Sequence, residues 1–158
     1  MSIFKVNYIL KFFLILLTLV FLNKTIYALE SQWSPSESSQ VRLISPLSHN
    51  NNKNEIIVGL EYQLEPGWKT YWQSPGAGGF PQELNWNNSK NVSNINISWP
   101  TPKEFEILEM KSIGYEDKVI FPLKINLIDS SKETLINLSI NYLICKDICI
   151  PGKALLLL

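Results

Sequence analysis

Two cysteines, Cys145 and Cys149, are separated by three residues in the run YLICKDICIPG. Such a pair can form a disulfide or, when reduced, bind a soft cation such as Cu(I). A disulfide needs Cα atoms within about 7 Å, whereas four extended peptide steps span about 13 Å. Lys146, Asp147 and Ile148 must therefore bend back, and Asp favours such turns. We expect a hairpin in which the two cysteines face each other and form a disulfide.

The residues alone leave the role of this bond open. As a structural crosslink, a loop this small contributes only about 2 kcal/mol in the chain-entropy model, against roughly 4 kcal/mol for a loop of tens of residues. For a redox role, Lys146 beside Cys145 favours the reactive thiolate, whereas Asp147 opposes it. The alternatives to thiol-disulfide exchange are a domain with an inert hairpin disulfide and a Cu(I) carrier.

The charge and histidine content argue against other chemistries. The 158 residues contain 14 Lys and Arg against 14 Asp and Glu. Three lysines and no acidic residue lie in the first 28, so the remainder has 11 basic and 14 acidic residues and a net charge of −3. Nucleic acid is not an expected partner, because phosphate binding needs a basic surface. The single histidine, His49, lies in an Asn-rich run and is expected to be a solvated loop residue. No histidine follows Cys149 to complete a copper site, and four zinc ligands cannot be found, so we expect no metal ion and no cofactor.

The first 28 residues predict a signal peptide. Lys5 and Lys11 precede an uncharged apolar run, Phe12 to Leu22, and the small residue Ala28 follows. The run is shorter than the roughly 20 residues of a membrane span, and a basic start with a short apolar core is typical of secretory signal peptides. An uncleaved anchor is the alternative. We expect residues 29–158 to be exported into a compartment where cysteine pairs oxidise.

The segments that would position the cysteines have the pattern of an all-β protein. From about residue 40, short apolar stretches alternate with turn signals. The clearest strand is Glu133 to Ile144, whose parity places Cys145 on the polar face, and the run 153–158 (KALLLL) is expected to pair with it. Seven to nine strands in about 120 residues predict an immunoglobulin-like β-sandwich. The other expected strands are Gln40 to Ile44, Glu55 to Leu64, Trp68 to Gln73, Glu83 to Trp86, Asn94 to Trp99 and Lys118 to Ile128.

Two segments are expected to be loops. Residues 74–82 (SPGAGGFPQ) contain too much Gly and Pro for a strand, and residues 103–117 mix charged and apolar side chains without clean alternation. The aromatic residues Trp68, Tyr71 and Tyr142 are expected mainly to fill the core, although Trp68 and Tyr71 are also placed to border the cysteines.

An ordered series of motifs resembles the N-terminal periplasmic domain of DsbD-type thiol:disulfide interchange proteins, in particular the branch that includes the ScsB proteins. The resemblance covers nearly the whole chain after residue 28. The motifs are GWKTYW (67–72), SPGAGGFP (74–81), Trp99-Pro100, IGYEDKVIFPLKI (113–125) and YLICKDICIPG (142–152).

The resemblance implies a periplasmic immunoglobulin-like domain that belongs to a protein-disulfide reductase system, with a link to cytochrome c biogenesis. Its cysteine pair, Cys145 and Cys149, would carry electrons from a membrane-embedded DsbD/ScsB-type donor to oxidised thioredoxin-like proteins, and Cys149 would be the attacking thiol. Members of the family usually continue into a membrane domain, so the electron donor would be either another polypeptide or a further C-terminal part of the same protein.

The resemblance also implies a cap loop that shields the pair. The cap corresponds to Glu104 to Tyr115, with Leu108, Met110 and Ile113 as cap residues. The chain departs from the best-known members of the family at two points. It spaces the cysteines by three residues instead of five, and it has no aromatic residue at the tip of the cap.

Overall fold

The computed structural model describes residues 28–46, 54–107 and 109–158, and these residues form strands and turns only. The expected signal peptide, except for Ala28, and His49 lie outside the described residues. Within the described ranges, no helix has the length and apolar character needed to cross a membrane. The all-β class predicted from the sequence is confirmed.

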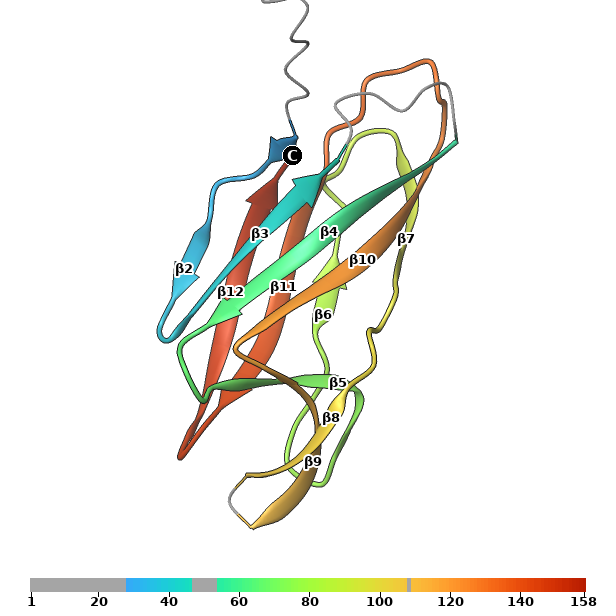
Figure 1. Cartoon of the computed structure of the whole chain (residues 1–158). Helices are drawn as coiled ribbons and strands as arrows, with labels where there is room; N and C mark the ends of the chain where they lie inside the picture. The colour runs from blue at the N-terminus through green and yellow to red at the C-terminus, as the bar shows by residue number, and fades with distance from the viewer. Residues whose placement is uncertain (1–27, 47–53, 108) are drawn as a thin grey trace, which may run out of the picture.

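Two antiparallel sheets pack face to face, as Figure 1 shows. The first sheet contains, in order, β1 (Leu29–Glu30), β3 (Ser39–Ser45), β4 (Glu55–Leu64), β10 (Lys118–Leu127) and β7 (Val92–Ile97), with β2 (Ser34–Ser36) beside β3. The second contains β12 (Cys149–Leu157), β11 (Asn137–Cys145), β5 (Lys69–Gly76), β9 (Met110–Glu116) and β8 (Lys103–Ile107), with β6 (Glu83–Asn85) beside β11. The described part thus has 12 strands, more than the seven to nine predicted, because the short strands β1 and β2 were not expected and β8 and β9 lie in a segment expected to be a loop.

The main core lies between the two sheets. Alternation along β10 and β11 turns every second side chain inward, so that Phe121 and Tyr142 are almost fully buried. The Tyr62 ring meets these two rings edge to face, with centroid distances of 5.5 Å to Phe121 and 5.1 Å to Tyr142. Burial of each such side chain stabilises the fold by about 1.5–3 kcal/mol. Tyr142 therefore belongs to the core, and its hydroxyl lies 2.9 Å from that of Ser39.

Residues 103–117 form a hairpin rather than the expected long loop. β8 and β9 pair from Lys103 opposite Gly114 to Ile107 opposite Met110. The prediction was wrong because the alternation in KEFEI is short and β9 does not continue it. On β9, the face that in β8 carries Phe105 and Ile107 holds Met110, Ser112 and Gly114, so only one of these three residues is a large apolar one. The second expected loop begins later than predicted, since β5 extends to Gly76.

A buried carboxylate on the outer face of the first sheet links several strands. Glu61 on β4 is 3% exposed; it accepts a hydrogen bond from Arg42 Nε on β3 at 2.6 Å, and Lys118 Nζ at the start of β10 lies 2.6 Å from its other oxygen. Arg42 also pairs with Glu30 of β1 at 2.7 Å. Burial acts to raise the pKa of Glu61, but the hydrogen bonds from Lys118 and Arg42 outweigh it and hold the pKa below its ordinary value.

We expect Glu61→Gln to lower the free energy of unfolding by about 1–3 kcal/mol at pH 7, because the charge-assisted hydrogen bonds are lost. A carboxyl with a lowered folded-state pKa stabilises fully above its unfolded pKa of about 4.3, and this contribution disappears as the pH falls through the folded pKa. Urea denaturation at pH 7 and pH 3 should therefore show a wild-type advantage that shrinks in acid. The exposed Glu65→Gln variant is the control, and an advantage of equal size at both pH values would contradict the assignment.

Candidate functional site

A three-residue turn between β11 and β12 brings the two cysteines together. Cys145 and Cys149 are direct partners in the ladder, with Cα atoms 4.1 Å apart, and their sulfur atoms form a disulfide. The turn is closed by the amide of Lys146, which donates to the Ile148 carbonyl oxygen at 2.9 Å. The hairpin and the disulfide predicted from the spacing are both present.

The disulfide is buried asymmetrically. Cys145 is 0% exposed, whereas Cys149 is only half-buried. The alternation along the strand correctly predicted that Cys145 lies on the face of β11 opposite the main core. It also implied that Cys145 is exposed to solvent, which is wrong. A second small core covers that face. It contains Tyr71, Phe105, Ile107, Leu143, Cys145 and Cys149, and we call it the cysteine cluster.

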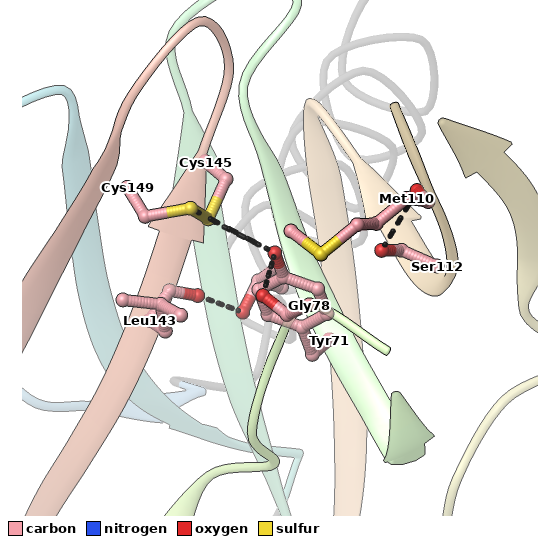
Figure 2. The surroundings of a disulfide bond; sticks show 8 residues. Tyr71, Gly78, Met110, Ser112, Leu143, Cys145 and Cys149 are labelled. Atoms are coloured by element: carbon pink, nitrogen blue, oxygen red, sulfur yellow. Dashed lines mark hydrogen bonds between the residues drawn. A yellow bond between two sulfur atoms is a disulfide. The ribbon is translucent and has the colours of Figure 1, made fainter. Parts of the chain in front are cut away.

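Tyr71 on β5 brings a hydroxyl to the disulfide, as Figure 2 shows. The hydroxyl oxygen lies 2.9 Å from Cys145 Sγ and 4.0 Å from Cys149 Sγ. It also lies 3.2 Å from the carbonyl oxygen of Gly78. Burial raises the pKa of Tyr71, so the hydroxyl keeps its single proton at neutral pH. It can donate this proton to Cys145 Sγ or to the Gly78 carbonyl oxygen.

The glycine-rich loop after β5 holds the Tyr71 ring. A Cβ atom on Gly79 would lie only 2.2 Å from Cε1 of the ring, so the backbone of this loop passes directly over Tyr71. At the neighbouring Gly78, a Cβ would meet the terminal methyl of Met110 at 2.8 Å. The glycines that predicted a loop at residues 74–82 thus also allow the backbone to lie close to Tyr71 and Met110.

The basic residue that faces Cys145 across the sheet is Lys69. It lies directly opposite Cys145 in the β5–β11 ladder, and ladder partners share one face. Its ammonium donates to the Gly67 carbonyl oxygen at 2.9 Å and lies 3.3 Å from a Glu116 carboxylate oxygen. Lys146, adjacent to Cys145 in the sequence, is exposed and turns back to the Pro66 carbonyl oxygen at 3.2 Å.

The remaining predicted neighbours are divided between two regions. Met110 packs beside Gly78 near Tyr71 (Figure 2), and Asp147 is exposed in the turn. Trp68 packs against the main core, and Tyr142 lies within it. Ile113 is paired with Glu104, whereas Met110 is paired with Ile107. Because side chains alternate along a strand, Ile113 lies on the face of β9 opposite to that of Met110. Leu108 lies outside the described residues.

Sequence reasoning did not single out Phe105, Ile107 and Lys69 as site residues. Phe105 and Ile107 lie in a segment expected to be a loop, although the alternation in KEFEI already places them on one face. The position of Lys69 follows from the register of β5 against β11, which no local pattern encodes.

A family model described as thiol:disulfide interchange protein DsbD, N-terminal, matches residues 40–158. The chain belongs to this DsbD N-terminal family. The N-terminal periplasmic domain of ScsB from Proteus mirabilis has a similar structure, with a TM-score of 0.70 and 30% identity, covering 84% of this chain and 51% of that one. The chain therefore spans about half the length of that ScsB domain.

The N-terminal domain of Neisseria meningitidis DsbD, in the reduced form, gives a TM-score of 0.44 and 13% identity, with coverage of 79% of this chain and 87% of that one. A search of curated proteins gives no match. The DsbD and ScsB resemblance predicted from the sequence motifs is confirmed by the family model and by the ScsB structure.

Gly79→Ala is expected to lower the free energy of unfolding by about 1–3 kcal/mol, because the added methyl forces the Tyr71 ring out of its position. Gly78→Ala is a matched control in the same loop, since the nearest atom to its methyl is the flexible end of Met110, and it should cost less than about 1 kcal/mol. Urea denaturation of the oxidised domain measures both. Equal losses would contradict the close packing of Gly79 on Tyr71.

Ile107→Ala should expose Cys145. Ile107 is 2% exposed and packs in the cysteine cluster, so its truncation opens a path to the sulfur. In a Cys149→Ser background, we expect iodoacetamide to alkylate Cys145 about threefold or more faster, because reactivity depends on access to the sulfur. Ile113→Ala, on the opposite face of β9, should leave the rate unchanged. A melting curve for each variant checks that the fold persists, and equal alkylation rates would contradict the shielding role.

Proposed function

We propose that this chain is a periplasmic thiol-disulfide exchange domain in which Cys145 and Cys149 alternate between disulfide and dithiol. The proposal rests above all on one observation: a DsbD-family hairpin carries a disulfide between a fully buried cysteine, Cys145, and a partly exposed one, Cys149. Such a bond offers one sulfur atom for attack and keeps the other as a leaving group. The proposal includes the β8–β9 hairpin as the cover of the cysteine pair, because β8 contributes Phe105 and Ile107 to the cysteine cluster.

The proposed organisation is a signal peptide over residues 1–28 followed by the redox domain over residues 29–158. The basic start and short apolar run support the first part, and the family match over residues 40–158 supports the second. The similar ScsB domain is named as periplasmic, which supports the same compartment for this chain.

The proposed partners follow from electron balance. Two cysteines store two electrons, so the domain must be reduced again after each exchange. We assign a membrane-embedded DsbD/ScsB-type protein as the donor and oxidised thioredoxin-like proteins as acceptors. In the forward step the Cys149 thiolate attacks the acceptor disulfide and releases one acceptor thiolate. Cys145 then attacks Cys149 in the mixed disulfide, which reforms the Cys145–Cys149 bond and releases the reduced acceptor.

The proposal is tested by trapping the mixed disulfide. In cells that contain the native donor and acceptors, Cys145→Ser should leave Cys149 joined covalently to a thioredoxin-like partner, because the resolving thiol is absent. Cys149→Ser should trap much less, since Cys145 is fully buried. Partners are identified by non-reducing electrophoresis and mass spectrometry. Recovery of no covalent partner from either variant would reject the exchange function.

The reduction potential separates exchange from an inert structural bond. An exchange pair should have a potential near or above about −230 mV, whereas structural disulfides in secreted proteins lie below about −300 mV. Equilibration of the purified domain with glutathione or dithiothreitol buffers measures it. A value below about −300 mV would favour the alternative of a binding module with an inert hairpin disulfide.

A further inference from the structure

We propose that Tyr71 is a catalytic residue of the exchange reaction: its hydroxyl stabilises Cys145 Sγ as the leaving thiolate when the disulfide is attacked at Cys149. The inference rests on the proposed exchange function and identifies a hydrogen-bond donor for it. The observation that carries it is the 2.9 Å contact between the Tyr71 hydroxyl and Cys145 Sγ in a fully buried position.

Burial decides which sulfur is attacked. An incoming thiolate must approach a sulfur atom that it can reach, and Cys149 is partly exposed whereas Cys145 is 0% exposed. Attack at Cys149 Sγ breaks the S–S bond, and the bonding electron pair leaves on Cys145 Sγ. A negative charge thus develops on the sulfur atom that water cannot reach, and a buried charge needs a hydrogen-bond donor.

The hydrogen bond from Tyr71 strengthens as the S–S bond breaks. In the oxidised domain its single proton has two acceptors, the Gly78 carbonyl oxygen at 3.2 Å and the Cys145 sulfur, and sulfur in a disulfide is a weak acceptor. A thiolate is a charged acceptor and forms a much stronger hydrogen bond. An interaction that is stronger in the transition state than in the ground state accelerates the reaction.

The position of the hydroxyl is fixed before the reaction. Tyr71 is 0% exposed, its ring lies under the backbone at Gly79, and its neighbour Phe105 lies at a centroid distance of 6.4 Å. The raised pKa that burial causes keeps the proton on Tyr71. The donor therefore needs little reorganisation when the charge forms.

Charged groups around the pair do not replace this donor. The Lys69 ammonium, opposite Cys145, is paired with Glu116 at 3.3 Å and bonded to Gly67 at 2.9 Å. In the turn, Lys146 reaches back to Pro66, and Asp147 is exposed and of the wrong sign. The hydrogen bond to Cys145 Sγ comes instead from the Tyr71 hydroxyl, at 2.9 Å.

The reaction with dithiothreitol isolates this step from any protein partner. One thiolate of the reagent attacks Cys149 Sγ, and Cys145 leaves as a thiolate hydrogen-bonded to Tyr71. The second reagent thiolate then attacks the mixed disulfide, which releases Cys149 and closes the oxidised reagent ring. The released cysteine thiolates take protons from solvent according to their pKa values, and two electrons pass from the reagent to the domain.

The decisive variant is Tyr71→Phe, which removes only the hydroxyl. In a Cys149→Ser background we expect the pKa of the Cys145 thiol, followed by thiolate absorbance, to rise by about one unit, a tenfold loss of thiolate below the pKa. With both cysteines present, reduction by dithiothreitol should slow by about threefold or more, because a less acidic thiol leaves more slowly. Tyr115→Phe is the matched control, since its hydroxyl donates to the Pro100 carbonyl oxygen, and it should change neither value.

Gly79→Ala provides a second test, because it displaces the Tyr71 ring without removing the hydroxyl. We expect a shift of the Cys145 pKa in the same direction. A Cys145 pKa and a reduction rate unchanged in Tyr71→Phe would overturn the inference. If Cys145→Ser still traps a partner in that case, the exchange function stands without Tyr71; a raised pKa with no trapped partner would instead reject the exchange function alone.

Discussion

The pairing of Cys145 with Cys149 at the end of the β11–β12 ladder determines the rest of the site. Ladder partners share a face, so both sulfur atoms point away from the main core that β11 forms with Tyr142 and Ile144 on its other side. By the same rule, Lys69 on β5, which pairs with Cys145, and Glu116 on β9, which pairs with Lys69, lie on this face of the sheet. One register thus separates the stabilising core from the reactive face.

This separation means that the disulfide needs a cover of its own. A sulfur on the outer face of a sheet would be open to solvent, yet Cys145 is 0% exposed. The cover is assembled from segments far apart in the sequence: Tyr71 from β5, Phe105 and Ile107 from β8, and the glycine loop that packs on Tyr71. Because the cover does not extend equally over Cys149, the two sulfur atoms differ in access, and the chemical asymmetry of the pair follows from the packing.

The sequence predicted those features whose causes are local. The alternation of β4 and β11, the turn at Lys146 to Ile148 and the face on which Cys145 lies follow from neighbouring residues. The burial of Cys145 could not be predicted in this way, because parity specifies a face but not what covers it. Likewise, Lys146 was favoured as the local charge because it is adjacent in sequence, whereas the register places Lys69 opposite the sulfur. The family resemblance indicated the cap region, but only the pairing of β8 with β9 separates Met110, on the disulfide side, from Ile113 on the other face.

A neutral donor suits this buried site better than a cation. The site changes by one negative charge when the S–S bond opens, and a permanent ammonium next to Cys145 would need a counter-ion in the oxidised state to avoid an unpaired buried charge. Lys69 already has a counter-ion in Glu116, 3.3 Å away, in the oxidised state. The hydroxyl of Tyr71 has no such requirement: it can donate to the Gly78 carbonyl while the disulfide is closed and to sulfur once the thiolate forms. The glycine at position 79 allows this arrangement, because any side chain there would displace the ring that carries the donor.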